Sequence, residues 1–124
     1  MKGQSNEGVY VFESFIDAMS HAELTNIRYG KSDAWIKHNR LSLSGTSDVA
    51  LDSWLKRNPD VSKICFCLDN DDAGRRATNK MVQKYRDIGY EVYVTYPSAK
   101  DYNEELLNIK QRLAEETQAE IETE

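Results

Sequence analysis

The stretch that decides the fold is Ile64-Cys65-Phe66-Cys67-Leu68-Asp69-Asn70-Asp71-Asp72. Its first five residues are apolar in succession, which is typical of a strand buried on both faces of a parallel sheet. The polar residues that follow end the strand, and Asp69 or Asn70 can cap the helix that they open. We therefore predict a strand over 64–68 and a helix ended by Gly89. The apolar stripe of this helix should face the sheet; it consists of Ala73, Ala77, Met81, Tyr85 and Ile88.

Strand and helix patterns alternate on both sides of this stretch. Upstream, residues 9–12 predict a buried strand, and Ser14 can cap a helix that carries Ile16, Met19, Ala22 and Leu24. Residues 25–38 are expected to be irregular. A second strand is expected over 40–44, then a helix that Thr46 or Ser47 can cap and that stops at Pro59. Downstream, residues 92–94 predict a fourth strand, and a last helix should begin near Asn103.

This alternation predicts an α/β fold, a Rossmann-like three-layer α/β/α sandwich around a four-stranded, mainly parallel sheet. We hypothesise the strand order 2-1-3-4, which makes strands one and three neighbours. Residues 1–8 are expected to be a flexible lead-in, residues 9–107 the folded domain, and residues 108–124 an acidic helical tail, frayed at its end.

Composition and charge narrow the class of protein. The chain has 124 residues, 40% of them hydrophobic and 30% charged, which is typical of one globular domain. We expect it in the cytoplasm, because no apolar run reaches the ~20 residues of a membrane span and no signal peptide opens the chain. The net charge of −5 is concentrated in residues 101–124, which hold eight acidic and two basic residues. The rest is nearly neutral, so the charge does not exclude a nucleic-acid partner.

Acidic residues follow several of the predicted strands. Glu13 follows the first strand, Asp69 and Asp71 follow the third, and Asp101 follows the fourth. Asp17 lies one helical turn beyond Glu13 and can face the same crevice. Parallel strands end at one edge of the sheet, where α/β proteins bind ligands, so we expect these carboxylates to converge. Mg²⁺ or Mn²⁺ would relieve their mutual repulsion. Asp69 and Asp71 would then bind the metal, and Glu13 would remain free for proton transfer.

Several of the candidate site residues also have a structural explanation that involves no metal or substrate. Asp69, Asn70, Asp71 and Asp72 can all be explained as the capped first turn of a helix. Arg75 and Lys100 could contact phosphates, although Arg75 also fits a basic surface helix. Cys65 and Cys67 lack a second ligand pair and are not a zinc site. His21 and His38 receive no role, and the tryptophans and tyrosines are expected in the core or at its rim.

Four of these segments resemble the motifs of the Toprim family. They are Glu13 to Asp17, Ser42 to Gly45, Cys67 to Gly74, and Pro97 to Glu104. The amino-acid sequence of these segments is most similar to primase-like Toprim segments of bacterial mobile-element proteins. The resemblance implies that Glu13 is a general acid or base and that Asp69 and Asp71 bind magnesium, supported by Asp17 and Asp101. Asn103 stands where primases commonly carry a further acid.

The resemblance also implies a function and its alternatives. It implies a Mg²⁺- or Mn²⁺-dependent catalytic domain for phosphodiester chemistry on DNA or RNA, by primase-type nucleotidyl transfer or strand cleavage. The chain would then be part of a larger DNA-replication or mobilisation protein, or a stand-alone small Toprim. The alternative is a non-catalytic Toprim scaffold that binds nucleic acid or a partner protein. A phospho-acceptor receiver domain fits poorly, because its acid pair would have to follow strand one.

Overall fold

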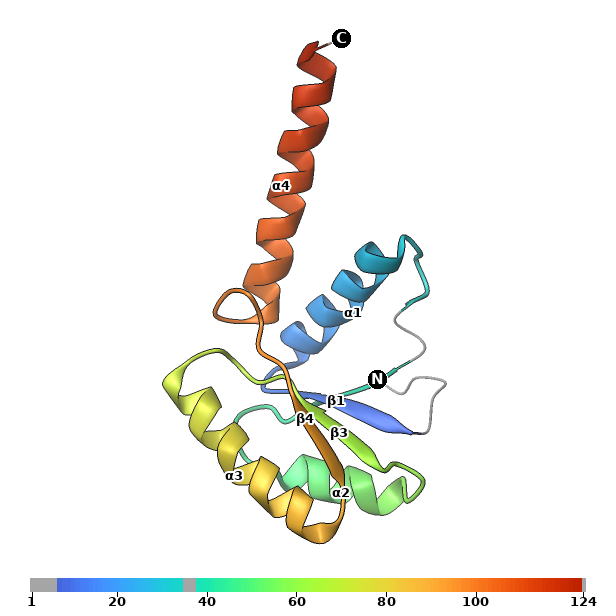
Figure 1. Cartoon of the computed structure of the whole chain (residues 1–124), viewed down its shortest axis with the longest axis vertical. Helices are drawn as coiled ribbons and strands as arrows, with labels where there is room; N and C mark the ends of the chain where they lie inside the picture. Colours follow the sequence, from blue (N-terminus) through green and yellow to red (C-terminus); the bar gives the residue numbers. More distant parts are fainter. Residues whose placement is uncertain (1–6, 35–37, 124) are drawn as a thin grey trace.

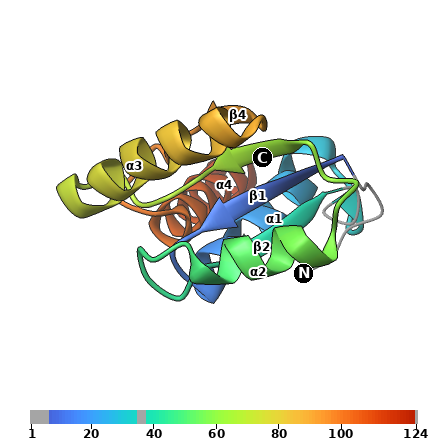
Figure 2. The same cartoon turned by 90° about the horizontal axis from the view of Figure 1, so that it is seen from below.

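The computed structural model describes residues 7–34 and 38–123, which form one α/β domain (Figure 1). The elements in chain order are β1 (Gly8–Phe12), α1 (Phe15–Tyr29), β2 (Asn39–Ser42), α2 (Val49–Arg57), β3 (Lys63–Phe66), α3 (Asp72–Ile88), β4 (Glu91–Val94) and α4 (Tyr102–Thr123). All strand pairs are parallel and the sheet order is β2-β1-β3-β4, which confirms the predicted fold class and order. Figure 2 views the same sheet along the axis of α4.

Helices pack on both faces of the sheet, and each face has its own apolar cluster. On one face α2 and α3 cover the strands. The apolar cluster there contains Val11, Ile64 and Phe66 from the strands, and Leu51 and Tyr85 from the helices. On the other face α1 and the first turn of α4 cover only part of the sheet; the smaller cluster there comprises Phe12, Ala18, Cys67 and Tyr102. Side chains alternate between faces along a strand, so these two clusters follow directly from the period of two in β1 and β3.

The helix α1 is longer than its sequence pattern indicates. Ser14 caps it as predicted, because its hydroxyl accepts a hydrogen bond from the Asp17 amide. The helix continues to Tyr29, so the prediction of irregular structure from residue 25 is wrong for 25–29. Gly30 ends it in the left-handed conformation, at φ 65°. Of the remaining predicted irregular segment, residues 35–37 lie outside the described part of the chain.

Two apolar side chains of α1 do not enter the core. Ile16 and Met19 are 62% and 52% exposed, although their spacing suggested a buried stripe. The buried positions are instead Asp17, Ala18, Ser20 and Ala22. The helix is therefore rotated so that polar Asp17 and Ser20 point inward, which places them at the functional edge described below.

The helix α3 is also rotated relative to the predicted stripe. Met81 and Tyr85 face the sheet as predicted, but Ile88 is 62% exposed and Ala73 is also exposed. Gly74 and Thr78 are buried in their place. The cap is Asp71, whose Oδ1 accepts from the Gly74 amide at 2.8 Å, rather than Asp69 or Asn70. The cap of α2 is Asp48 rather than Thr46 or Ser47.

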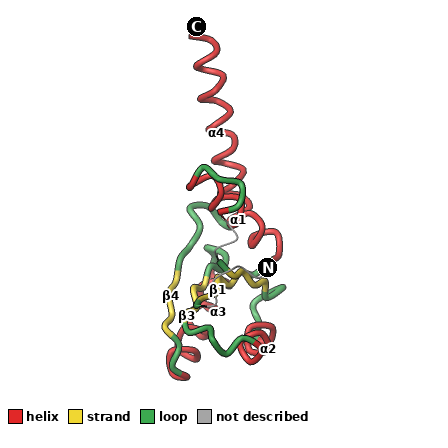
Figure 3. Tube along the Cα trace, turned by 90° about the vertical axis from the view of Figure 1, so that its right-hand side faces the viewer, coloured by secondary structure: helices red, strands yellow, loops and turns green. Residues whose placement is uncertain are grey.

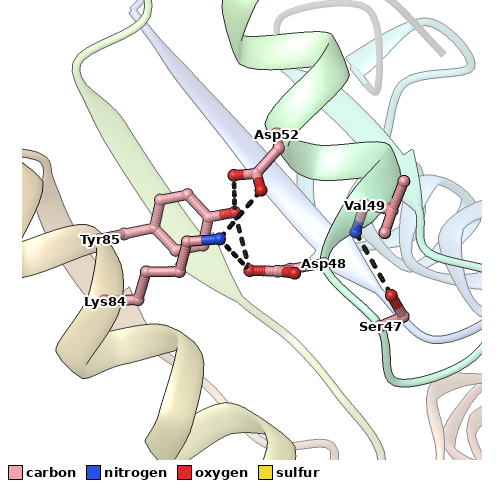
Figure 4. A network of polar contacts seen from close by, with 6 residues as sticks. All are labelled: Ser47, Asp48, Val49, Asp52, Lys84 and Tyr85. Carbon is pink, nitrogen blue, oxygen red and sulfur yellow. Dashed lines mark hydrogen bonds and ion pairs between the residues drawn. The ribbon is translucent and has the colours of Figure 1, made fainter.

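A polar network joins α2 to α3 (Figure 4). The Lys84 ammonium donates to Asp48 at 2.7 Å and to Asp52 at 2.9 Å, and the hydroxyl of buried Tyr85 donates to both carboxylates. Burial, together with the bond to Asp52, raises the pKa of Tyr85. Ser47 lies beside this network and accepts from the Val49 amide at 3.4 Å. The network fixes α2 against α3 on the face opposite α1.

The last helix leaves the body of the domain. α4 packs its first turns against α1, with an ion pair of 2.8 Å between Lys110 and Glu23, and then extends away from the sheet (Figures 1 and 3). The acidic tail expected over 108–124 is thus a helix as far as Thr123. Among the helices of the described residues, none has the length and apolar character needed to cross a membrane.

Candidate metal centre

The ends of β1 and β3 bring Glu13 and Asp69 together. The Asp69 amide donates to Oε1 of Glu13 at 3.2 Å, as the neighbouring positions of the two strands predict. The turn after β2 holds the backbone of Glu13 from the other side, because the Gly45 amide donates to its carbonyl at 2.8 Å. Glu13 is thus fixed between its two neighbouring strands. Oε1 of its carboxylate accepts the Asp69 amide hydrogen, and the role of Glu13 in proton transfer stays a prediction.

Close packing at Gly74 sets the distance between this strand edge and α3. A Cβ atom on Gly74 would lie 2.2 Å from the carbonyl oxygen of Asp69 and 2.8 Å from Oε1 of Glu13. No side chain can be accommodated at such distances, so the first turn of α3 can approach the two acids only because residue 74 is glycine. This is the physical reason for a glycine two residues after the helix begins.

Three carboxylates converge beside Glu13. Asp17, Asp69 and Asp101 each offer an oxygen, and these oxygens lie within 4.8 Å of one another. They come from α1, from the loop after β3 and from the loop after β4. Asp17 is 5% exposed, whereas Asp69 and Asp101 are half-buried. The structure therefore brings together Glu13 and three of the four predicted metal ligands.

Hydrogen bonds with helix ends orient these carboxylates. Oδ1 of Asp17 accepts from the Asn103 amide at 3.1 Å and Oδ2 accepts from the Ser14 hydroxyl at 2.9 Å. Oδ1 of Asp101 accepts from the Glu104 amide at 2.8 Å and so caps the start of α4. Oδ1 of Asn103 accepts a 3.3 Å hydrogen bond from the Ser20 hydroxyl at the contact of α1 with α4.

Asp71 has a different position from the one its spacing suggested. One of its oxygens caps α3, and within the described ranges it is not among the carboxylates that converge within 4.8 Å. It lies close enough to Glu13 for its charge to raise the pKa of that side chain. A two-residue spacing in a turn does not by itself direct two side chains to one point.

Burial and mutual repulsion change the acidity of the centre. Partial burial, then the charges of Glu13, Asp17 and Asp101, raise the pKa of Asp69 from 3.8 to about 7. Burial also raises the pKa of Glu13; the Asp69 amide counteracts this, and the charges of Asp71 and Asp17 add to it. Near neutral pH the cluster therefore shares a proton, which is best placed on Asp69.

The donor set fits a hard divalent cation. All the ligand atoms are carboxylate oxygens, which Mg²⁺ and Mn²⁺ prefer over nitrogen or sulfur. The three oxygens lie within 4.8 Å of one another, close enough for one cation to be shared among them. A cation would also replace the shared proton and remove the repulsion. Asp17, Asp69 and Asp101 are the residues that would hold it.

Basic and aromatic side chains lie next to these acids. Arg75 of α3 is exposed, donates to Oδ1 of Asn70 and lies over the ring of Tyr96, 5.9 Å from its centroid. The Asn70 amide in turn donates to the carbonyl of Lys100 at 2.7 Å, while the Lys100 side chain is exposed. Asn70 thus links the loop that carries Asp69 with the loop that carries Asp101. The sequence analysis placed Tyr96 with the core or rim tyrosines; its position two residues after the end of β4 was the available signal for a place at this edge.

The histidines and Tyr102 contribute to packing. The ring of His21 packs at tilted or edge-on angles against the rings of Tyr10, Phe12 and Tyr102, and its Nδ1 accepts from Nε of buried Arg40 at 3.1 Å. Burial, together with the positive charge of Arg40, lowers the pKa of His21 to about 3, so this side chain is neutral. Tyr102 is 6% exposed and belongs to the core, consistent with the prediction of core or rim.

Solved structures share the fold of this chain. A primase fragment of the bacteriophage T7 primase-helicase is similar over 89% of this chain and 43% of its own, with 25% identity and a TM-score of 0.61. A chain from the complex of the T7 lagging-strand DNA polymerase with primase domains, an RNA/DNA hybrid and dTTP has 25% identity and a TM-score of 0.59, covering 89% of this chain and 52% of its own. A putative protein from Aquifex aeolicus, with 23% identity and a TM-score of 0.52 over 70% and 68% of the two chains, shares the fold. No curated protein sequence matches.

Family membership follows from the sequence profile. The chain spans only about half the length of the T7 chains, so their similarity concerns one domain of larger proteins. The profile of the Toprim-like family matches residues 10–106, which include every strand except part of β1, and both acidic loops. The chain therefore belongs to the Toprim-like family.

Proposed function

We propose that this chain is a Mg²⁺- or Mn²⁺-dependent catalytic domain for phosphodiester chemistry on nucleic acid, by primase-type nucleotidyl transfer or strand cleavage. The observation that carries the proposal is the convergence of Asp17, Asp69 and Asp101 within 4.8 Å, next to a Glu13 fixed by the Asp69 amide. The similarity to primase fragments, which are parts of larger proteins, supports DNA or RNA as the partner. The parent protein would act in DNA replication or mobilisation, in the cytoplasm.

The residues divide the chemistry between them. A bound divalent cation would supply positive charge for phosphate oxygens and stabilise the charge that develops on them. Glu13 lies beside the cluster, and burial raises its pKa above the usual value of a glutamate, which supports a role in proton transfer. Arg75 and Lys100, both exposed at this edge, would contact further phosphates. We keep Asp71 as a candidate second-metal or water-mediated ligand, because its charge acts on Glu13.

The test separates metal binding from turnover. Mg²⁺ and Mn²⁺ are titrated into the chain by calorimetry and by NMR, and synthesis and cleavage are followed on labelled oligonucleotides with the parent protein. Glu13→Gln should lose at least a hundredfold in turnover and keep metal binding, because proton transfer by a side chain contributes about 10²–10⁴-fold. Glu116→Gln, on the exposed distal part of α4, is the matched control. Normal turnover of Glu13→Gln would refute the role of Glu13.

One observation favours a second candidate, a non-catalytic Toprim scaffold. Asp17, Asp71 and Asp101 already accept hydrogen bonds from helix ends, so each has a structural role without metal. The same titration decides between the two candidates. Chemical shifts of Asp17, Asp69 and Asp101 that do not move up to millimolar Mg²⁺ and Mn²⁺ would favour the scaffold.

A further inference from the structure

One face of the sheet is only half covered. The partners Tyr10, Cys65 and Tyr93 lie in one row across β1, β3 and β4, and they point to the side of α1 and α4. Tyr93 is 50% exposed, because α4 leaves the sheet instead of crossing it (Figure 1). Within the described ranges, no helix covers this row at β4. Strands lie ~4.8 Å apart, so the row extends over about 10 Å.

Two adjoining hollows follow this face. One, of about 430 Å³, lies between the sheet, α1 and α4; the other, of about 410 Å³, lies over the start of β1, β3 and β4. They share three lining residues, Tyr10, His38 and Thr95, so together they form one groove. Each has the size of a pocket that holds a small organic group such as a nucleobase.

Aromatic rings are unusually frequent in this groove. Tyr29, Tyr93 and Tyr96 are 61%, 50% and 39% exposed, and all three line it. Exposed rings provide flat apolar faces with hydrogen-bonding edges, which is the composition that nucleic-acid-binding surfaces use to stack unpaired bases. The packing of the core does not account for three tyrosines that are exposed in this groove.

Basic side chains lie in the groove and at one end of it, where they can contact phosphates. Arg28 lines it, and the guanidinium of buried Arg40 lies beneath it, 5.7 Å from the centroid of the Tyr10 ring. Arg75 lies over the ring of Tyr96, at the end of the groove next to the acidic cluster. The acids that line it are Glu7 and Glu105; Glu7 pairs with Lys63 at 3.6 Å, and Glu105 accepts from the Ser98 amide at 2.8 Å.

We propose that this tyrosine-lined groove binds a single strand of DNA or RNA, with bases stacked on Tyr96, Tyr29 and Tyr93 and phosphates at Arg75 and Arg28. The inference rests on the proposed function in one respect, because it supplies the substrate strand of the same site. Tyr96 is the link between the two: its ring lines the groove, and its partner Arg75 is held by Asn70, directly after Asp69. A duplex, whose bases are already stacked, should bind more weakly.

Binding without metal tests the groove separately from the catalytic proposal. A fluorescein-labelled dT₁₂ is titrated with the chain in EDTA and followed by anisotropy. Tyr96→Ala should weaken binding about tenfold, since stacking of one base contributes about 1–3 kcal/mol, and Tyr96→Phe should retain it. Arg75→Ala should reduce the slope of log binding constant against log salt concentration by about 0.7, because one phosphate contact is lost. The matched controls are Ile88→Ala and Arg76→Ala, exposed side chains at the far end of α3 and beside Arg75.

NMR shifts of the unmodified protein give a second measurement that does not depend on variants. With dT₁₂, shifts of Tyr29, Tyr93 and Tyr96 would support the groove. Shifts confined to Arg76 and Lys80 of α3 would overturn it, and so would shifts of the tyrosines with protein concentration alone, which would identify a second copy as the occupant. If Mg²⁺ binding and Glu13-dependent turnover are found but the groove does not respond, the inference fails while the proposed function stands. If the groove binds dT₁₂ but the acids bind no metal, the proposed function fails while the inference about the groove stands.

Discussion

Replacing Asp69 by asparagine should stabilise the metal-free protein at neutral pH. Asp69 is the side chain on which repulsion in the cluster is concentrated, and burial together with three neighbouring acids raises its pKa from 3.8 to about 7. The folded state therefore holds a proton that the unfolded state releases. Stability is lost as pH rises from about 4 to 7, and the penalty is complete above pH 7. Asparagine removes the charge and keeps the shape, so the variant should not have this penalty.

The size of the effect follows from the pKa. A change from 3.8 to about 7 corresponds to about 4 kcal/mol at 1.36 kcal/mol per pH unit. Asp69 is only half-buried, so water screens the repulsion, and we expect about 1–2 kcal/mol. For a domain of 124 residues this raises the melting temperature of Asp69→Asn by about 4–8 °C above the original chain at pH 8. At pH 4 the two should melt together.

The assay is thermal unfolding by circular dichroism in EDTA, in steps from pH 4 to pH 8.5. Asp60→Asn, in an exposed turn, is the matched control and should leave the difference near zero at every pH. The melting temperatures must be compared between variants at each pH, because His21 makes stability depend on pH in the opposite direction. Its pKa is about 3 in the folded protein, so the stability that neutral His21 contributes is present above pH 6.5 and is lost as pH falls toward 3. An Asp69→Asn variant that melts below the original chain at pH 8, or by the same margin at pH 4 and pH 8, would refute the reasoning.

Further substitutions and conditions test other parts of the structure. Mg²⁺ affinity should fall about tenfold per pH unit below pH 7, because the metal competes with the proton of Asp69; calorimetry at pH 5.5, 6.5 and 7.5 checks this, and a flat profile would contradict it. Gly74→Ala should cost about 1–3 kcal/mol in urea unfolding and weaken Mg²⁺ binding, since its Cβ would meet the Asp69 carbonyl at 2.2 Å; an unchanged midpoint would show that α3 can move. Tyr85→Phe should cost about 1–3 kcal/mol by leaving the network between α2 and α3 without its hydroxyl, whereas Tyr90→Phe should cost less than half of this. His21→Leu should reduce the loss of stability between pH 6 and pH 4; equal loss in both proteins would place the acid sensitivity elsewhere.

The order of elements and of strands could be predicted because it depends on residue periods that are local in the sequence. A five-residue apolar run with a helical stripe after it can form little else than a strand followed by a crossover helix, and handedness then places every strand end at one edge. The contact of Glu13 with Asp69 follows from that order alone. Residues 25–29 were predicted to be irregular, but they continue α1, and Gly30 is its C-terminal cap.

The rotation of the helices could not be predicted, and it decides which acids meet. The stripe read for α1 placed apolar Ile16 and Met19 inward, but hydrogen bonds of Asp17 and Ser20 with Asn103 at the start of α4 turn the helix the other way. These partners are more than 80 residues apart, so no local pattern contains them. Likewise, Asp71 caps its own helix while Asp101, much farther away in the chain, joins Asp17 and Asp69.

Some of the proposed metal ligands also stabilise helix ends, and this affects how related sequences should be compared. Asp17 and Asp101 anchor the start of α4, and Asp71 anchors the start of α3, so folding alone favours an acid at each position. A relative that has lost catalysis can therefore be expected to retain these three aspartates for many generations. Glu13 and Asp69 anchor no helix end, and the raised pKa values show that their charges are a burden on the folded state. Glu13 and Asp69 should therefore be the first acids that an inactive relative loses. These two positions are the ones to inspect when catalytically active members are to be distinguished from inactive ones.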